Sequence, residues 1–175
     1  FNHRIMFICR ENDEWLVTAK DIKKRYEFTQ SFDVILICTG RYSVPHWPKY
    51  DTMKKFKGKL LHSHDYRQPE DYIGQRIAVI GGGLSGVDIS QECSHHCKEV
   101  IFVNNGKMRF QNMFPNVQQV DVKVEEFTEN SIIARDNDGN RIEYQVDTII
   151  MATGYVYNLK FVDPNVGIKA NPDGT

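Results

Sequence analysis

A glycine-rich turn between an apolar run and a helical pattern constrains the fold of this chain most. Residues 76–80, Arg-Ile-Ala-Val-Ile, are typical of a buried parallel strand. Gly81, Gly83 and Gly86 follow at the spacing GxGxxG, and a helical pattern then begins. In such a unit the first glycine permits a sharp turn, the second a close approach of pyrophosphate, and the third tight helix packing. The motif therefore predicts a dinucleotide-binding unit, with phosphates at the helix N-terminus.

Length and charge narrow the class of protein. The 175 residues suffice for one substantial domain and pieces of another. A formal net charge of -1 does not favour nucleic acid as a partner, and the basic runs at 23–25 and 54–57 are interpreted as solvated faces. No apolar run approaches the roughly 18 residues that span a bilayer. Because the chain begins at Phe1 within a strand-like region, we expect an internal fragment of a longer protein.

The first forty residues predict strands. Partial alternation in three short runs predicts an antiparallel meander at 3–10, 14–20 and 25–29. The continuous apolar run 32–40 ends in glycine and predicts a buried strand. Cys9 and Cys38, within apolar runs, are expected to be small core residues. The connector 41–49 contains two prolines and is the best candidate for a domain boundary.

The remainder predicts an α/β unit with a second meander. A helix is expected at 84–95, with Leu84, Val87 and Ile89 packed on the sheet, then a strand at 100–103. A turn at 104–106 and an irregular stretch at 107–115 precede the second meander, expected at 120–127, 131–136 and 141–144, with a hairpin turn at 137–140. The run 146–154 repeats the form of 32–40, with Asp near its start and Thr-Gly at its end.

Four ordered motifs resemble one family. Phe56, Gly58, His62 and Tyr66 fit the fingerprint FxGxxxHxxx(Y/F), which lies just upstream of the glycine motif. Thr-Gly at 39–40 and at 153–154 is similar to the two interdomain linkers of the same proteins. The chain thus resembles the flavin-containing monooxygenases, which oxygenate soft nitrogen or sulfur nucleophiles. Tyr66 stands where related Baeyer–Villiger enzymes carry Trp, and this favours heteroatom oxygenation.

The resemblance implies a domain plan. Residues 1–40 would be the C-terminal part of an FAD-binding Rossmann-like domain, a meander plus a strand. Residues 41–153 would be a Rossmann-type NADPH-binding domain with an inserted antiparallel meander, and 154–175 a truncated return to the FAD domain. The FAD-binding glycine motif of the family is absent, so the fragment alone is expected to bind no FAD and to be inactive.

The resemblance also implies a mechanism for the intact protein. NADPH would deliver hydride to FAD, reduced flavin would react with dioxygen, and the resulting C4a-hydroperoxyflavin would oxygenate an amine or sulfide. A cytoplasmic or endoplasmic-reticulum-associated protein is expected. An FAD-dependent disulfide reductase is the enzymatic alternative, although no CxxC or CxxxxC pair is present. A catalytically silent nucleotide-binding protein is another alternative.

The expected cofactor-binding residues lie on the glycine turn, after the next strand and at the two linkers. An NAD site usually has an acidic residue at the end of the strand after the glycine turn, and the segment 103–107 has none, which favours NADPH. Lys107 or Arg109 would bind its 2′-phosphate, unless both are simply solvated. The expected set is Gly81, Gly82, Gly83, Leu84, Ser85, Gly86, Asn104, Asn105, Lys107, Thr39, Gly40, Thr153 and Gly154.

His62 and the cysteines of the helix end have competing interpretations. His62 is expected to hydrogen-bond backbone at the linker, with direct proton transfer as the catalytic alternative. Phe56 and Tyr66 are expected to pack beside it. The spacing of Cys93 and Cys97 does not match that of structural zinc sites, and no metal site is expected.

Overall fold

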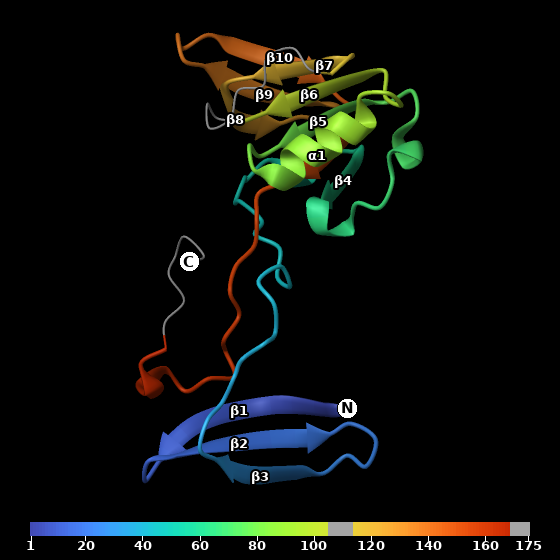
Figure 1. Cartoon of the computed structure of the whole chain (residues 1–175). Coiled ribbons are helices and arrows are strands. Elements are labelled where there is room, and N and C mark those ends of the chain that lie inside the picture. The colour runs from blue at the N-terminus through green and yellow to red at the C-terminus, as the bar shows by residue number, and fades with distance from the viewer. Residues whose placement is uncertain (105–113, 169–175) are drawn as a thin grey trace. The chain divides into compact units, whose positions relative to one another are not determined.

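The computed structural model describes residues 1–104 and 114–168, which form two compact units (Figure 1). The first unit combines Phe1–Val44 with the described part of Tyr155–Thr175, and the second is the described part of Pro45–Gly154. Residues 105–106 of the expected turn and 107–113 of the expected irregular stretch lie outside the described residues. The assignment of the segments 1–40, 41–153 and 154–175 to FAD and NADPH domains stays a prediction.

The first unit contains the expected antiparallel meander. Its strands are β1 (His3–Glu11), β2 (Glu14–Asp21) and β3 (Glu27–Phe32), hydrogen-bonded in that order. Asn12 and Asp13 form the first turn with positive φ angles of 48° and 67°, which these residue types tolerate. The short helix η4 (Pro164–Val166) follows a single parallel bridge from Val162 to Ile8.

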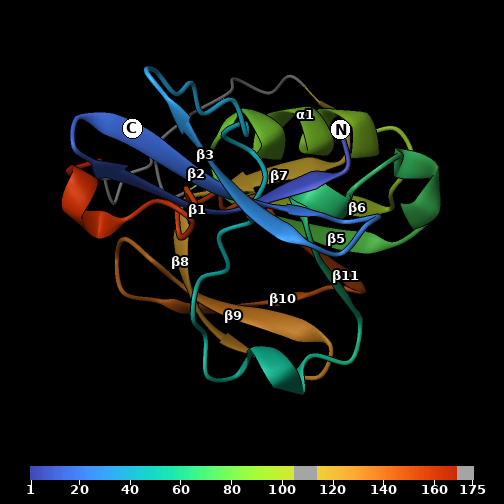
Figure 2. The same ribbon diagram turned by 90° about the horizontal axis from the view of Figure 1, so that it is seen from below.

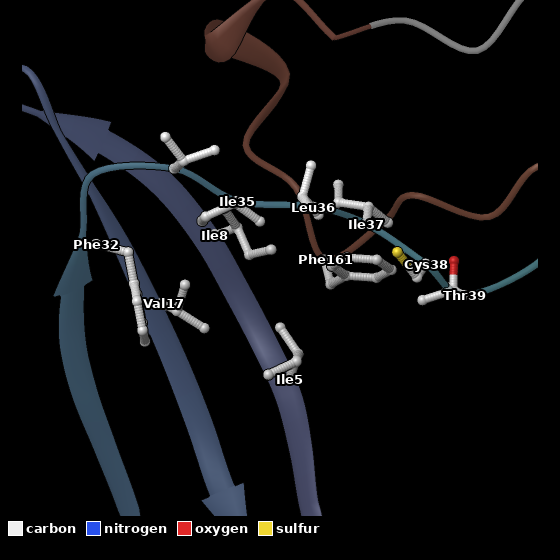
Figure 3. Close-up of a pocket in the computed structure, with 11 residues that line it drawn as sticks. Ile5, Ile8, Val17, Phe32, Ile35, Leu36, Ile37, Cys38, Thr39 and Phe161 are labelled. Atoms are coloured by element: carbon white, nitrogen blue, oxygen red, sulfur yellow. The ribbon is translucent and has the colours of Figure 1, made fainter.

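The predicted buried strand at 32–40 is wrong. Residues 33–40 contain no strand, and Val34 and Leu36 are 73% and 84% exposed. Ile35 and Ile37, which alternate with them, are half-buried and line an apolar groove of about 300 Å³ (Figure 3). A strand needs a hydrogen-bonded neighbour, and none of the described strands pairs with this segment. Cys38, within this segment, is exposed, and Cys9 in β1 is half-buried, so neither is the core residue that we expected.

The second unit is built on a five-stranded parallel sheet, which confirms the α/β class. The order is β4 (Lys59–His62), β11 (Thr148–Met151), β5 (Arg76–Ile80), β6 (Glu99–Val103) and β7 (Val117–Val120). Helix α1 (Leu84–Cys93) connects β5 to β6. The short helices η1 (Met53–Lys55), η2 (Ser63–Asp65) and η3 (Pro69–Tyr72) flank β4.

The inserted meander forms a separate antiparallel sheet. Its strands are β8 (Val122–Phe127), β9 (Ser131–Asp136) and β10 (Arg141–Gln145), in the order β10-β9-β8. In Figure 2, α1 lies on one side of the parallel strands and β9 and β10 on the other, so the unit has three layers. We expected a single strand over 120–127. Instead, Asp121 separates β7 from β8, and the chain changes sheets there.

Alternation along the parallel strands divides the core in two. Ala78 and Ile80 face the antiparallel sheet, whereas Ile77 and Val79 face α1. The buried residues on the antiparallel side include Phe127, Ile132 and Met151, while Ile89 and Phe102 lie on the helix side. Burial of a Val, Ile or Phe side chain contributes about 1.5–3 kcal/mol, so these two faces stabilise the unit.

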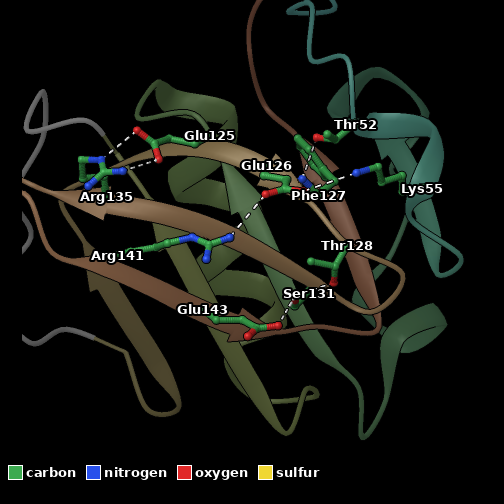
Figure 4. Close-up of polar contacts among 10 residues, drawn as sticks. All are labelled: Thr52, Lys55, Glu125, Glu126, Phe127, Thr128, Ser131, Arg135, Arg141 and Glu143. Atoms are coloured by element: carbon green, nitrogen blue, oxygen red, sulfur yellow. Dashed lines mark hydrogen bonds and ion pairs between the residues drawn. The ribbon is translucent and has the colours of Figure 1, made fainter.

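Hydrogen bonds and ion pairs lie on the antiparallel sheet formed by β8, β9 and β10 (Figure 4). Glu125 pairs with Arg135 at 2.9 Å, and Glu126 lies 3.4 Å from both Lys55 and Arg141. Glu126 is half-buried and its partners, like Glu125 and Arg135, are exposed, and ion pairs at the surface contribute about 0–1 kcal/mol. The hydroxyl of Thr52 accepts the Phe127 N–H at 2.8 Å. The buried apolar face, rather than the ion pairs, therefore holds this sheet.

Candidate nucleotide-binding site

Parallel pairing brings the carboxyl ends of the strands to one edge of the sheet. Ile80 at the end of β5 is in register with Val103 of β6 and with Met151 of β11, and Met151 is in register with His62 of β4. The glycine turn, Asn104, the segment 152–154 and His62 consequently meet at this edge. In open α/β sheets, ligands bind outside the carboxyl ends of the strands, where the strand order reverses. That reversal falls between β5 and β11.

Gly81 and Gly86 are glycines because backbone approaches them closely. A Cβ on Gly81 would clash with the carbonyl oxygen of Ala152, and its φ of 132° disfavours any other residue. A Cβ on Gly86 would clash with the carbonyl oxygen of Gly81 and would lie 3.1 Å from the ring of Phe102. The chain therefore turns sharply at Gly81, and α1 packs against the end of β5 at Gly86.

Gly83 differs from its neighbours because it faces open space. A Cβ there would meet no atom within 4 Å. Gly83 is the N-cap of α1, no side chain caps the helix, and its first turn has no acidic residue. The positive end of the helix dipole is thus presented at an unobstructed turn, which suits an anionic ligand. Gly82 packs closely instead, since its Cβ would lie 2.6 Å from the Asn104 carbonyl oxygen.

Leu84 does not pack on the sheet as we expected. Its side chain is 75% exposed, whereas Ile89 is buried and Val87 half-buried. The buried positions of α1 are 86, 89, 90 and 93, a single stripe of helical spacing. Leu84 precedes this stripe by two residues, a rotation of about 200° around the helix axis. Leu84 and Ser85 are therefore exposed at the open end of the turn.

The neighbouring strand end and the linkers hold the other expected residues. Asn104 is buried directly after β6, and its N–H donates to the Val120 carbonyl at 3.2 Å. Thr153 donates its hydroxyl to the His46 carbonyl at 2.6 Å, and the His46 N–H donates to Gly154 at 2.9 Å. These bonds fix the segment after β11 to the proline-containing connector. Thr39 and Gly40 belong to the first unit, and Asn105, Lys107 and Arg109 lie outside the described residues.

The fingerprint residues surround the start and end of β4. Phe56 is buried against the antiparallel side of the core. A Cβ on Gly58 would clash with the carbonyl oxygen of Asp147 and lie 2.6 Å from the Phe56 ring, so this position requires glycine. The two residues pack the start of β4 against the rest of the sheet.

His62 is fully buried at the end of β4. Its Nδ1 accepts the His64 N–H at 3.1 Å, and its ring lies 5.6 Å from that of Trp47. An accepting Nδ1 places the proton of the neutral imidazole on Nε2. Burial lowers the pKa of His62 below its ordinary value, while a hydrogen bond with the Gly154 backbone opposes this shift. The neutral ring thus joins β4, η2 and the linker, an arrangement that favours the structural interpretation of His62.

The lowered pKa of His62 predicts acid-sensitive folding. Above the ordinary value of about 6.5 the ring is neutral in both states. As the pH falls toward the lowered folded value, only the unfolded chain gains a proton, so the free energy of unfolding decreases. We expect the urea concentration at the unfolding midpoint to decrease as the pH is lowered below about 6.5. The His62→Asn variant should lose part of this pH dependence. An identical pH profile in both proteins would contradict the assignment.

Tyr66 connects the fingerprint to the helix that follows the glycine turn. Its hydroxyl donates to Glu92 of α1 at 2.8 Å and lies 3.7 Å from the sulfur of Cys93. Its ring stacks on Tyr72 with an interplanar angle of 11°. Burial, followed by the bond to Glu92, raises the pKa of the Tyr66 phenol, which therefore stays protonated. The sequence gives no local signal for Glu92 as the partner, because 26 residues separate the two.

Removal of the Tyr66 hydroxyl should loosen this connection. We expect Tyr66→Phe to reduce the free energy of unfolding by about 1 kcal/mol, because one hydrogen bond is lost while the stacking on Tyr72 remains. Equilibrium urea unfolding measures this change. Glu92→Gln retains an acceptor and should cost less; equal stability of the Phe variant and the wild type would show that the bond does not contribute.

The described residues contain neither grouped metal ligands nor a helix that could span a membrane. Within 1–104 and 114–168, no three His, Cys, Asp or Glu side chains are grouped to hold a metal ion. No helix in the same residues is both long and apolar enough to cross a bilayer. Cys93 and Cys97 are buried, and the Cys97 thiol donates to the Tyr72 carbonyl at 3.4 Å.

The fold and the site define a Rossmann-type unit with a glycine turn at the carboxyl edge of its sheet. The sequence matches the family described as "Flavin-binding monooxygenase-like" over residues 9–109, more than half of the chain. The chain belongs to this family, whose members bind flavin.

Individual proteins that are similar to this chain are named as monooxygenases or oxygenases. Trimethylamine monooxygenase of Pelagibacter sp. (strain HTCC7211) is 25% identical over 171 residues, or 98% of this chain and 38% of the relative. Its crystal structure superimposes with a TM-score of 0.84 at 26% identity, over 98% of this chain and 38% of that one. Senecionine N-oxygenase of Tyria jacobaeae is 29% identical over 90% of this chain and 35% of the relative. S-allyl-L-cysteine S-oxygenase of Allium sativum gives a TM-score of 0.77 at 28% identity, over 97% of this chain and 38% of that one.

The aligned region covers a much larger share of this chain than of its relatives. This chain is matched almost completely, yet it spans little more than a third of the length of these relatives.

Proposed function

We propose that this chain is the pyridine-nucleotide-binding part of an NADPH- and FAD-dependent monooxygenase that oxygenates a soft nitrogen or sulfur atom. The observation that carries the proposal is the turn at Gly83, open to a ligand and followed by an uncapped helix N-terminus. Membership of the flavin-binding family supports the oxygenase chemistry. Relatives named as a trimethylamine monooxygenase and an S-oxygenase support a nitrogen or sulfur substrate.

The residues at the carboxyl edge of the sheet fit a dinucleotide. Gly83 and the first N–H groups of α1 would bind the pyrophosphate, with Leu84 and Ser85 in contact through their backbone. Val103 ends β6 and Asn104 follows it, and neither has a carboxylate that would repel a 2′-phosphate. This is why we propose NADPH rather than NADH. Asn105 and Lys107 remain candidates for the ribose end of the ligand.

The fingerprint and the linker would position the cofactor site rather than react. Thr153 and Gly154, bonded to His46, fix the edge of the sheet next to the glycine turn. Neutral His62, which is paired with Met151 of the adjacent strand β11, would hold the same segment through its hydrogen bond with the Gly154 backbone. When bound, NADPH supplies hydride, and FAD supplies the chemistry that activates dioxygen. Thr39 and Gly40 remain candidates for contact with the cofactors in the intact protein.

The experiment uses the full-length protein that contains this chain. NADPH should bleach its flavin absorbance under nitrogen, and addition of air with trimethylamine or an alkyl sulfide should yield the N-oxide or sulfoxide, detected by mass spectrometry. Reduction without oxygenated product would contradict the oxygenase proposal and favour a reductase. Absence of flavin with intact NADPH binding would favour a nucleotide-binding protein without catalysis.

A further inference from the structure

One face of the β1-β2-β3 sheet carries a cavity that is lined by three cations and two apolar side chains. The cavity has a volume of about 430 Å³, and its lining residues are Arg4, Met6, Lys20, Ile22 and Arg25. Strand pairing places Arg4 opposite Lys20 and Ile5 opposite Ala19. Since neighbouring side chains alternate between faces, the cations lie on the face opposite to Ile5, which lines the apolar groove of Figure 3. The cavity is thus separate from the groove, and its lining residues all belong to the first unit.

The charges around this cavity are not balanced. Like charges directly opposite in an antiparallel pair are destabilising, as Arg4 and Lys20 are here. Lys20 pairs with Glu27 at 3.6 Å, whereas Arg4 and Arg25 have no ion pair within the described part of the chain. All three charged residues that line the cavity are cations, and of these Lys20 is paired with a carboxylate, so the lining is positively charged. An anion in the cavity would relieve their repulsion.

The turn that carries Arg25 is fixed in advance. The Asp21 carboxylate accepts the N–H groups of Lys23 and Lys24 at 2.9 and 2.8 Å, and its other oxygen lies 3.7 Å from the His3 ring. The Arg25 N–H donates to the Asp21 carbonyl at 2.8 Å. Asp21 is buried, and these contacts hold the turn that carries Arg25. Little backbone entropy would therefore be lost when a ligand binds, although the side chains of Arg4, Lys20 and Arg25 would still have to be ordered.

Apolar side chains adjoin the cations. Met6 and Ile22 line the same cavity and are 41% and 54% exposed. A phosphate monoester carries nearly two negative charges at neutral pH, which suits a positively charged lining, and arginine binds phosphate oxygens in a bidentate manner. We propose that this cavity binds a phosphate monoester attached to an apolar group, with the phosphate between Arg4, Lys20 and Arg25 and the apolar part on Met6 and Ile22.

Backbone amide NMR of the folded chain tests the proposal. The titrants are short-chain phosphatidic acid, inorganic phosphate and short-chain phosphatidylcholine, which lacks a monoester. Phosphatidic acid should shift the resonances of residues 4, 20 and 25 saturably, and phosphatidylcholine should not. Binding should weaken as ionic strength rises, because the contacts are between charges.

Matched variants separate this site from a general effect of charge. Arg4→Gln/Arg25→Gln should weaken phosphatidic acid binding by about tenfold or more, because two charge-assisted contacts are lost. Lys123→Gln/Lys160→Gln removes the same charge from exposed positions elsewhere and should retain the wild-type affinity. Circular dichroism checks that each variant is folded, and the wild-type shift map needs no variant.

The titrants also distinguish the source of the phosphate. Tighter binding of phosphatidic acid than of inorganic phosphate would assign the site to a lipid headgroup. Equal affinities would assign it to soluble phosphate monoesters, without the apolar contact. No shift at residues 4, 20 and 25 with either phosphate, or an unchanged affinity in the Arg4→Gln/Arg25→Gln variant, would overturn the proposal.

Discussion

Gly86→Ala is expected to destabilise the chain by about 3 kcal/mol, in the upper range for overpacking of a well-packed site. The new methyl group would clash with the Gly81 carbonyl oxygen, which cannot move without displacing the end of β5. Alanine favours a helix over glycine by about 0.5–1 kcal/mol, so helix propensity alone predicts the opposite sign. Equilibrium urea unfolding, followed by circular dichroism, measures the difference.

Ser85→Ala is the matched control for this substitution. Ser85 lies on the same turn of α1 but is exposed, and its replacement should change stability by about 0.5 kcal/mol or less. If Gly86→Ala were as stable as this control, the close approach of α1 to the end of β5 would not exist in solution.

Gly83→Ser should have the reverse effect, with folding preserved and nucleotide binding lost. Gly83 is the N-cap of α1 and its Cβ would meet no atom, so serine fits and would cap the helix as well as glycine or better. In the proposed complex, however, the serine side chain would occupy the space of the pyrophosphate. We expect the dissociation constant for NADPH to rise about a hundredfold, which corresponds to about 2.7 kcal/mol.

The same pair of measurements on Gly83→Ser distinguishes the two roles of the glycine turn. The urea midpoint reports on folding, and quenching of intrinsic fluorescence by NADPH reports on binding. A serine variant that binds NADPH as tightly as the wild type would show that the open side of Gly83 does not face the phosphates.

The elements governed by local sequence were predictable. The spacing of the three glycines gave the turn and the start of α1, and the hairpin at 137–140 joins β9 to β10 as expected. Residues 76–80 form β5 within the predicted bounds. In each case the residues that determine the structure lie next to one another, so a pattern of a few residues is sufficient.

Tertiary context decided the rest. The apolar run 32–40 has the composition of a buried strand, but no described strand lies beside it to form a ladder. Leu84 is an apolar residue of the kind usually found in a core, yet its position on α1 leaves its side chain exposed to solvent. The bond from Tyr66 to Glu92 and the opposition of Arg4 and Lys20 depend on strand register and helix placement. Such contacts join residues that no local pattern relates.

Isothermal titration calorimetry of the folded chain with NADPH and NADH tests the central claim most directly. Nucleotide binding at the turn after β5 predicts saturable heat for one site with NADPH and weaker binding of NADH. No carboxylate at the end of β6 is available to bind the ribose hydroxyls of NADH, and none is present to repel the 2′-phosphate of NADPH. No heat with either nucleotide, from a chain that unfolds cooperatively in urea, would contradict it.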